Sequence, residues 1–291
     1  QRGKTKGKRI ADVAAPLPGT PEYDNNPEVY KAMQSALNVA GAASGWFVPP
    51  IRHGLTAIDS FHIKRAVEGS LKKLDTDYID LYQMHWPDTI VPIEESLRAF
   101  DDLVKEGKVR YIGTSNDSAY GLTKANETAK NNKLARFESI QNNFSLLNPR
   151  FLDELATVCK NEDISLLPYS PIAGGVLAGK YNNGLYPDGC RFTAYIKNKS
   201  PRVQAMADRF VNEKTIEATK RYMQLAKDYG ISPVTLAVAY SKHFNFVAST
   251  IIGARTLSQV DESLAAFDFK IDDELMKKIE EVQKDILYPM G

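Results

Sequence analysis

The sequence contains only two cysteines, Cys159 and Cys190, among its 291 residues. Two cysteines cannot build a disulfide framework, and neither lies in a CxxC or Cys/His spacing typical of a zinc site. The sequence has no apolar run long enough to span a bilayer, and it does not open with a signal segment in which charged residues precede apolar ones. Low cysteine usage is typical of a reducing compartment, so we expect a cytoplasmic protein.

The sequence also has no excess of positive or negative charge, because its formal net charge is only +1. Such a balance provides no general attraction for nucleic acid or for anionic membranes. The basic opening "QRGKTKGKR" is an exception. We interpret this short run as a loop or a frayed helix rather than a polyanion site. We therefore expect neither a nucleic-acid partner nor a membrane partner.

The remaining composition, 43% hydrophobic and 25% charged, is typical of a globular protein with a sizeable core. Domains average about 150 residues, but barrels commonly reach about 250 as one domain. We expect residues 1–291 to form a single domain. The first residue is Gln rather than Met. We therefore expect that residues upstream were removed, processed or left out.

Apolar strand-like runs alternate with amphipathic helix-like segments along most of the chain. One helix is expected at 62–74, where Ile63, Val67, Leu71 and Leu74 share a stripe and Asp59 or Ser60 is the N-cap. Strict alternation implies parallel strands, in a doubly wound sheet or a (β/α) barrel. No GxGxxG follows a strand, which disfavours the dinucleotide-binding sheet. The expected strands are 9–14, 77–85, 108–114, 137–141, 164–169 and 247–252, and the other expected helices are 92–108, 120–132, 149–162, 214–230, 257–267 and 272–286.

Polar residues gather where the predicted strands end. A histidine on a strand is more often a satisfied structural residue than a functional one. In a barrel, however, catalytic and binding groups lie at the carboxyl ends of the strands. Four successive strands here end in hydrogen-bonding groups, so we expect His85, Asn116, Gln141 and Tyr169 to converge on one functional site. The groups are His85, then Ser115 and Asn116, then Gln141 and Asn142, then Tyr169 and Ser170.

Five blocks covering about residues 56–291 resemble the aldo-keto reductases, which are NADP-dependent (β/α)₈ barrel oxidoreductases. The resemblance implies an α/β fold of the TIM-barrel type and reduction of a small-molecule aldehyde or ketone by hydride transfer. Each block alone is a weak signal, and their shared order and spacing make the resemblance strong. The blocks are "TDYIDLYQMHWPD", "LVKEGKVRYIGTSN", "SIQNNFSLLN", "LLPYSPIAGGVLAGKY" and "STIIGARTLSQVDESL".

The resemblance also implies roles for single residues. His85 matches the histidine that donates a hydrogen bond to the substrate carbonyl. Ser115, Asn116 and Gln141 match the side chains that hold the nicotinamide carboxamide, and Tyr169 matches the ring stacked on the nicotinamide. The remaining matches are the pyrophosphate loop (Ser170, Pro171, Ile172, Gly174, Gly175, Leu177, Gly179, Lys180) and the adenosine side (Gly253, Arg255, Thr256, Gln259, Glu262), with Ser263 where many members have Asn.

Each of these roles has a structural alternative. Gly174 and Gly175 could simply form a turn, and Tyr169 could be a core aromatic. Arg255 alone would more often be a solvated helix start. The family context favours the functional interpretation, in which Arg255 and Thr256 hold a 2′-phosphate and select NADP over NAD.

The match breaks near the N-terminus. The family's catalytic Asp, Tyr acid and Lys have no counterpart here, and Asp12 falls at the lysine position. Only six family strands can be counted. Residues 17–55 match no family motif and are expected to be a loop or insert around one short helix at 27–39. Tyr23 or Tyr30, both in this segment, could reach the site.

Three interpretations follow. The first is an NADPH-dependent carbonyl reductase whose N-terminal barrel units lie upstream, with the chain itself impaired in catalysis; Gln1 favours it. The second is a catalytically dead nucleotide-binding structural or regulatory subunit, favoured by Asp12. The third, a nucleic-acid binder, is disfavoured because the basic charge is local. We adopt the first interpretation.

Overall fold

The computed structural model describes residues 45–48, 59–88 and 91–290, which fall into two compact units. The first unit comprises Gln1–Asn142, Glu154–Leu167 and Gly253–Val260, and the second comprises Asn143–Asp153, Pro168–Ile252 and Asp261–Gly291. In the described part of the chain, no helix combines the length and the apolar character needed to cross a membrane.

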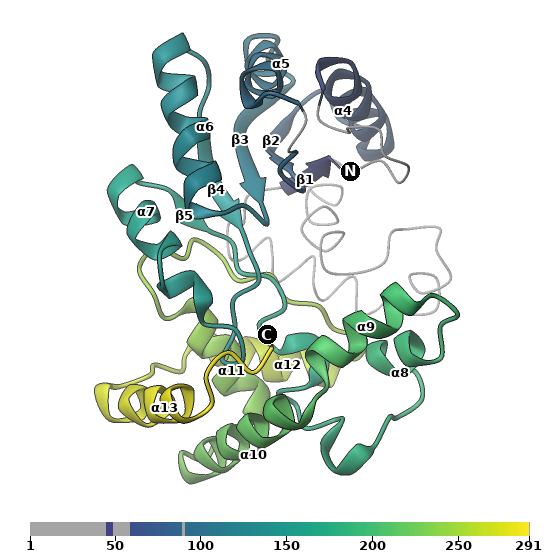
Figure 1. Cartoon of the computed structure of the whole chain (residues 1–291), viewed down its shortest axis with the longest axis vertical. Helices are drawn as coiled ribbons and strands as arrows, with labels where there is room; N and C mark the ends of the chain where they lie inside the picture. The colour runs from purple at the N-terminus through teal and green to yellow at the C-terminus, as the bar shows by residue number, and fades with distance from the viewer. Residues whose placement is uncertain (1–44, 49–58, 89–90, 291) are drawn as a thin grey trace. The chain divides into compact units, whose positions relative to one another are not determined.

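The first unit contains a five-stranded parallel sheet whose strands follow the order of the chain (Figure 1). A helix follows each of the first four strands, so each step is a β–α–β crossover, as the alternation predicts. The strands are β1 Gly45–Val48, β2 Ile79–Met84, β3 Val109–Ser115, β4 Phe137–Gln141 and β5 Ser165–Leu166. The helices are α4 Ser60–Leu74, α5 Ile93–Lys105, α6 Ala119–Asn132 and α7 Leu155–Glu162.

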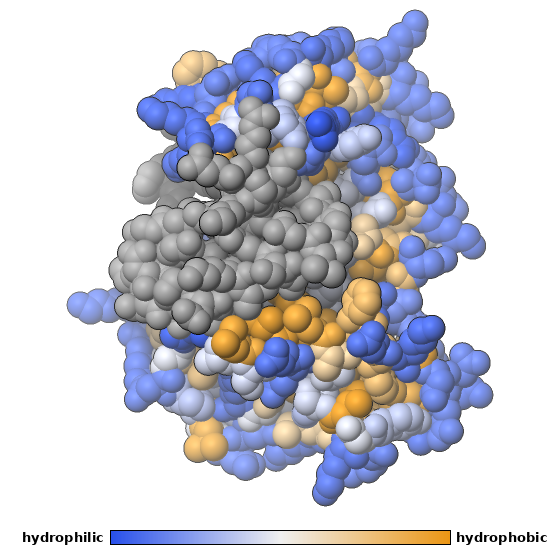
Figure 2. All heavy atoms as spheres, turned by 180° about the vertical axis from the view of Figure 1, so that it is seen from behind, coloured by the Kyte–Doolittle hydropathy of each residue, from blue (hydrophilic) through white to orange (hydrophobic). Residues whose placement is uncertain are grey.

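Helix α4 follows directly from its sequence. Asp59 is the N-cap, and its side chain accepts a hydrogen bond from the backbone N–H of His62 at 2.9 Å. This contact decides between the two predicted caps in favour of Asp59. The predicted apolar stripe is buried at Ile63, Val67 and the two leucines that follow. Figure 2 shows charged and polar side chains over much of one face, as expected when helices present their polar sides to solvent.

The strand register places small and polar residues side by side across the sheet. Gln83 of β2 pairs with Gly113 of β3, Gly113 with Ser139 of β4, and Ser139 with Ser165 of β5. Partners in a parallel register lie on the same face of a sheet. Two residues further along, Ser115 pairs with Gln141 on that same face. Parallel strands buried on both faces are normally continuous in apolar residues, so this polar face marks a special surface.

The second unit is mostly helical among its described residues (Figure 1). The sequence pattern does not predict α8, α9 or α11. Helix α11 has no amphipathic pattern, because Val234 through Ser241 are all buried. The helices are η1 Arg150–Leu152, η2 Ala173–Gly175, η3 Asn182–Gly184, α8 Arg191–Ile196, α9 Pro201–Phe210, α10 Glu213–Asp228, α11 Pro233–Lys242, α12 Leu257–Leu264 (which begins in the first unit), η4 Ala265–Phe267 and α13 Asp273–Asp285.

Two predicted strands are corrected by the structure. The predicted strand 247–252 does not form among the described residues, and the predicted strand 164–169 is reduced to Ser165–Leu166. Pro168 explains both outcomes, because proline has no N–H with which to continue a ladder. The backbone of Ile251 donates to the Pro168 carbonyl at 2.8 Å, and no strand develops from this contact.

The N-terminal third of the sequence contains a strand, Gly45–Val48, that is not among the six predicted strands. Gly45–Val48 pairs in parallel with Leu81–Met84 of β2, inside the segment expected to be a loop or insert. The flanking "GAAS" and "PPIRHG" are typical of turns, and they conceal a strand of only four residues. The predicted strand 9–14, Asp12, the predicted helix 27–39, Tyr23 and Tyr30 lie outside the described residues.

Candidate functional site

Three neighbouring strands of the first unit end in hydrogen-bonding side chains. His85 directly follows β2, Ser115 is the last residue of β3 and Gln141 is the last residue of β4. The Ser115 hydroxyl donates to the Gln141 carbonyl at 2.7 Å. Ser115 and Gln141 are both buried, so their geometry is fixed by the packing of the sheet. We call His85, Ser115, Asn116 and Gln141 the rim group.

Asn116 joins the strand ends to one another. Its side-chain Nδ2 donates to the His85 carbonyl at 2.9 Å and lies 3.1 Å from the Ser115 hydroxyl. Its backbone N–H donates to the Gln141 carbonyl at 3.0 Å. Asn116 has φ 56, in the left-handed region that asparagine adopts more readily than most residues. Asn116 therefore brings the ends of the strands at His85 and Gln141 together, through one hydrogen bond from its side chain and one from its backbone.

His85 is half-buried, and desolvation lowers the pKa of its imidazole. A lowered pKa keeps the ring neutral near pH 7, where it has one N–H donor and one acceptor nitrogen. The indole of Trp86 is 49% exposed, and its centroid lies 6.0 Å from the imidazole centroid. A neutral imidazole beside an accessible aromatic ring can orient a polar group by a hydrogen bond. It is a poor general acid, because only the imidazolium form gives up a proton readily near pH 7.

Two buried residues near the rim group were not singled out from the sequence. Asp117 accepts hydrogen bonds from the Thr114 hydroxyl at 3.1 Å and from the Ser118 N–H at 2.8 Å, and burial raises the pKa of its carboxyl. Gln83 is fully buried, and its Nε2 donates to the Thr114 carbonyl and the Ser139 hydroxyl, both at 3.3 Å. Position could have indicated both, since Asp117 follows Asn116 and Gln83 lies two residues before His85.

Asn142 presents a buried acceptor next to the rim group. Its Nδ2 donates to the Asp117 carbonyl at 3.1 Å, and its Oδ1 has no hydrogen-bond partner in the described part of the chain. A buried carbonyl oxygen without a donor is unfavourable by about 1–3 kcal/mol. This end of the sheet therefore fits a ligand that offers an N–H group, as a carboxamide does.

The predicted pyrophosphate loop, Ser170–Lys180, lies in the second unit. Ser170, Ala173, Gly174, Gly175 and Gly179 all have positive φ, between 48 and 99. Such a run keeps the chain tightly turned, with no side chain at the three glycines to obstruct a phosphate. The run also has a packing cause at Gly174 and Gly179, where a Cβ would collide with a neighbouring side chain.

Tyr169 precedes this loop and forms an isolated parallel bridge with Asn143. Its phenol has a raised pKa because it is desolvated, while the charge of Arg209 acts in the opposite direction. Tyr169 is half-buried. Tyr169 belongs to the second unit, and its predicted convergence with the rim group stays a prediction.

The start of α12 holds the residues predicted to bind the adenosine side. Arg255 and Thr256 are exposed, with Gly253 two residues before Arg255. The Arg255 N–H donates to Oε1 of Gln259 at 2.8 Å, and the Thr256 hydroxyl accepts from the Gln259 N–H at 3.3 Å. These two hydrogen bonds cap the start of the helix and place the exposed residue Arg255 at its positive end, which suits an anion.

Glu262 is placed further along α12, in the second unit. Its backbone carbonyl accepts a hydrogen bond from the Thr235 hydroxyl at 2.9 Å. Ser263, where many family members have Asn, is buried. A buried residue at that position offers little side-chain surface to a ligand.

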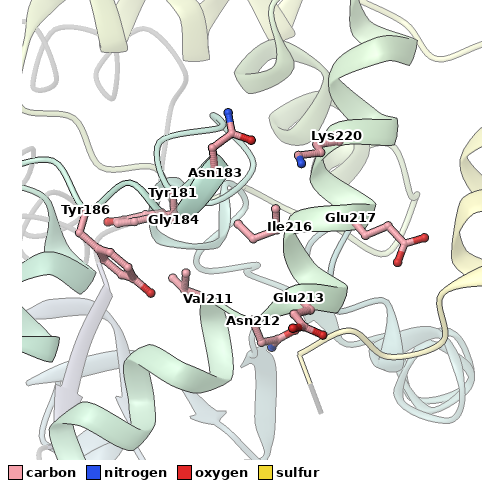
Figure 3. A pocket seen from close by; sticks show the side chains of 10 residues that line it. All are labelled: Tyr181, Asn183, Gly184, Tyr186, Val211, Asn212, Glu213, Ile216, Glu217 and Lys220. Atoms are coloured by element: carbon pink, nitrogen blue, oxygen red, sulfur yellow. The ribbon is translucent and has the colours of Figure 1, made fainter.

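A groove of about 470 Å³ lies elsewhere in the second unit, between the segment around Asn183 and the first turns of α10 (Figure 3). Tyr181, Tyr186 and Ile216 form apolar walls, and Lys220 extends toward Asn183. None of the predicted site residues lines it. We therefore assign the candidate site to the strand ends and not to this groove.

Comparison with known proteins identifies the family. The profile of the Aldo/keto reductase family matches residues 52–284. The chain belongs to this family. It is therefore related to oxidoreductases that generally use NAD(P)H, and its fold is of the α/β class with parallel strands found in (β/α)₈ barrels.

The chain covers a different share of each relative's length. The chain is 32% identical to "Protein tas" of Escherichia coli (strain K12), over 98% of this chain and 88% of that protein. It is 30% identical to "Uncharacterized oxidoreductase YrpG" of Bacillus subtilis (strain 168), over 78% of this chain. It is 30% identical to a "Putative voltage-gated potassium channel subunit beta" of Schizosaccharomyces pombe, again over 78% of this chain. The alignments span only 65% of each of the latter two proteins.

A solved structure supports the fold class. The chain is similar to the glycerol dehydrogenase AKR11B4 from Gluconobacter oxydans, with a TM-score of 0.65 and 26% identity. The likeness covers 80% of this chain and 67% of that protein. The family and the fold class that the sequence predicted are thereby confirmed.

Proposed function

We propose that this chain is an NADPH-dependent oxidoreductase that reduces aldehydes or ketones to alcohols. The observation that carries the proposal is the rim group, in which Asn116 joins the ends of β2, β3 and β4 by hydrogen bonds. Groups at the carboxyl ends of parallel strands are where barrel enzymes bind and transform substrates. The bound nucleotide would supply the hydride.

His85 would orient the substrate. Desolvation keeps its imidazole neutral near pH 7, so it has one N–H to donate to a carbonyl oxygen. Such a hydrogen bond fixes the carbonyl for attack and polarises its C=O bond. The half-exposed Trp86 beside it would bound an apolar substrate group.

Ser115, Asn116 and Gln141 would hold the nicotinamide carboxamide, and Tyr169 would stack on the ring. Their fit to a carboxamide is supported by the neighbouring Asn142 Oδ1, a buried acceptor that needs a donor. Hydride transfer requires the two carbon atoms at near-contact distance, so a clamp of this kind is needed on both sides of the ring.

The phosphates would lie on Ser170, Pro171, Ile172 and the residues after them, up to Lys180. The three glycines of this loop allow close backbone approach. Arg255 and Thr256 would bind the 2′-phosphate, and Gln259 and Glu262 the adenine side. Selection of NADP over NAD is supported by the exposed guanidinium at the start of α12. Both cysteines are free thiols, which suits a reducing cytoplasmic compartment.

Binding and turnover would be separable. The residues named above are proposed to bind the nucleotide and not to transfer a proton, and the family's Asp, Tyr and Lys have no match in residues 1–291. A fluorescence titration with NADPH should therefore show saturable binding whatever the turnover of a reactive aldehyde. A missing general acid lowers the rate by about 10²–10⁴-fold.

The two measurements together test the proposal. His85→Gln should leave NADPH affinity unchanged and lower kcat/KM for the aldehyde. NADPH binding without any turnover would favour the alternative function, a nucleotide-binding structural or regulatory subunit. Absence of NADPH and NADH binding would overturn the proposed function altogether.

A further inference from the structure

The ring of Phe192, from α8, is packed directly against Gly174 of the Ser170–Lys180 loop. A Cβ added to Gly174 would lie 2.6 Å from Cε2 and 2.7 Å from Cζ of Phe192. The ring is 1% exposed, and Gly174 itself has φ 64. Contact this close is possible only because residue 174 has no side chain. The loop and α8 are therefore shaped to each other.

Phe192 is in turn held from two sides. Its backbone N–H donates to the hydroxyl of Tyr181 at 3.2 Å, and the two ring centroids lie 5.6 Å apart. On the other side the ring stacks on Phe210, at the end of α9, with centroids 4.8 Å apart and planes at 29°. Tyr181 directly follows the loop and forms part of the groove wall in Figure 3. Phe192 thus connects α8 and the end of α9 to both Gly174 and the end of the loop.

A second contact supports the loop near its end. A Cβ on Gly179 would lie 2.8 Å from Sδ of Met223 in α10, and the side chain of Asn182 lies 3.3 Å from the same sulfur. The loop is therefore packed at Gly174 on a rigid aromatic ring and at Gly179 on a flexible thioether. Methionine adapts to its surroundings with little resistance, whereas a stacked phenylalanine does not. The Phe192 contact is the more restrictive of the two.

We infer that Phe192 is a positioning residue that holds the Ser170–Lys180 loop in the conformation described above and thereby sets how fast the nicotinamide nucleotide dissociates. The inference rests on the proposed function for the nucleotide, although the packing on which it depends does not. Ser170 and Ala173 have positive φ without being glycine, a conformation that persists only when the surroundings impose it. Loss of the ring would let the loop relax to other conformations, each of which binds the phosphates less well.

The experiment compares two phenylalanine-to-leucine variants of the full chain. Phe192→Leu keeps apolar volume next to Gly174 but removes the flat ring. Phe151→Leu is the matched control, because Phe151 is buried in the same unit and packs on Phe144 and Phe246 rather than on the loop. Urea unfolding first shows how much stability each variant loses. Stopped-flow release of NADPH and hydrogen exchange of peptides covering 170–180 are then measured for both.

We expect Phe192→Leu to speed NADPH release about tenfold, because affinity falls in proportion to the population of the competent loop. Exchange of the 170–180 amides should rise in the nucleotide-free protein, and neither effect should appear in Phe151→Leu. Equal release rates and equal loop exchange in the two variants would overturn the inference. If the unaltered chain binds no nicotinamide nucleotide, the proposed function fails, and the exchange comparison alone decides whether Phe192 holds the loop.

Discussion

Substitution of Gly113 by alanine tests the packing beneath the rim group. Gly113 lies in β3 between Gln83 and Ser139, two residues before Ser115. A Cβ there would be 2.4 Å from the Ser139 hydroxyl oxygen, 2.9 Å from the Ser139 carbonyl oxygen and 3.1 Å from Nε2 of Gln83. The hydroxyl can rotate away. The carbonyl is part of the β4 backbone, so it can move only if the strand moves.

The expected loss follows from this geometry. Overpacking of a buried site destabilises by roughly 1–3 kcal/mol, and the upper part of this range applies where backbone must shift. Gly69→Ala is the matched control, because Gly69 lies in α4 and an added Cβ would meet nothing within 4 Å. Alanine is favoured over glycine inside a helix by about 0.8–1.0 kcal/mol. The same chemical change should therefore destabilise at position 113 and stabilise at position 69.

Urea unfolding followed by tryptophan fluorescence measures both effects. Both tryptophans, Trp46 and Trp86, lie in the first unit, which also contains both glycines. The double substitution Gly113→Ala with Ser139→Ala removes the hydroxyl conflict but not the carbonyl conflict. It should therefore recover only part of the loss. A Gly113→Ala variant at least as stable as the unaltered chain would refute the packing argument.

Three further predictions concern charged and titrating groups. Arg255→Ala should weaken NADPH binding about tenfold or more and NADH binding little, because a charge-assisted bond contributes roughly 1.5–3 kcal/mol; equal weakening of both would contradict the 2′-phosphate role. The pKa of Asp101 is held below its ordinary value, because bonds from Lys105 and the Ala135 N–H outweigh burial, which alone would raise it. The unaltered chain should therefore lose stability as the pH falls below about 4, and Asp101→Asn should flatten urea midpoints in that window, whereas parallel curves would exclude this role. The pKa of His85 is lowered by burial, so NMR should show its imidazole titrating below the ordinary value of about 6.5. Acidification through that range should destabilise the fold, because the unfolded chain binds the proton at a higher pH than the folded chain does. A titration midpoint at or above about 6.5 would contradict the effect of burial.

Much of the first unit could be predicted from the sequence, because its signals are local. The stripe from Ile63 to Leu74 defines α4 by its period, and Asp59 caps it through a side chain only three residues from its partner. The strand ends at His85, Ser115 and Gln141 were likewise predictable, since each apolar run stops at a polar residue. Because parallel strands end at one edge of a sheet, the order of these runs also predicted that His85, Asn116 and Gln141 would meet.

Other features depended on residues far apart in the chain. The strand Gly45–Val48 exists because β2 offers it a partner, and a strand of four residues gives no periodic signal. The predicted strand 247–252 failed for the opposite reason, since Pro168 cannot extend a ladder with Ile251. Helix α11 is buried on all sides, so it has no polar face from which a helical period could be read.

The sequence by itself determined the family, the β–α alternation and the residue types at the strand ends, because these follow from patterns within a few residues. Only the tertiary structure decided which glycine was a packing requirement. Ser139 leaves no room for a Cβ at position 113, and Phe192 leaves no room for one at position 174. Neither partner is near in the sequence. Close packing joins residues that the chain separates, so the space available to a side chain is known only once the fold has formed.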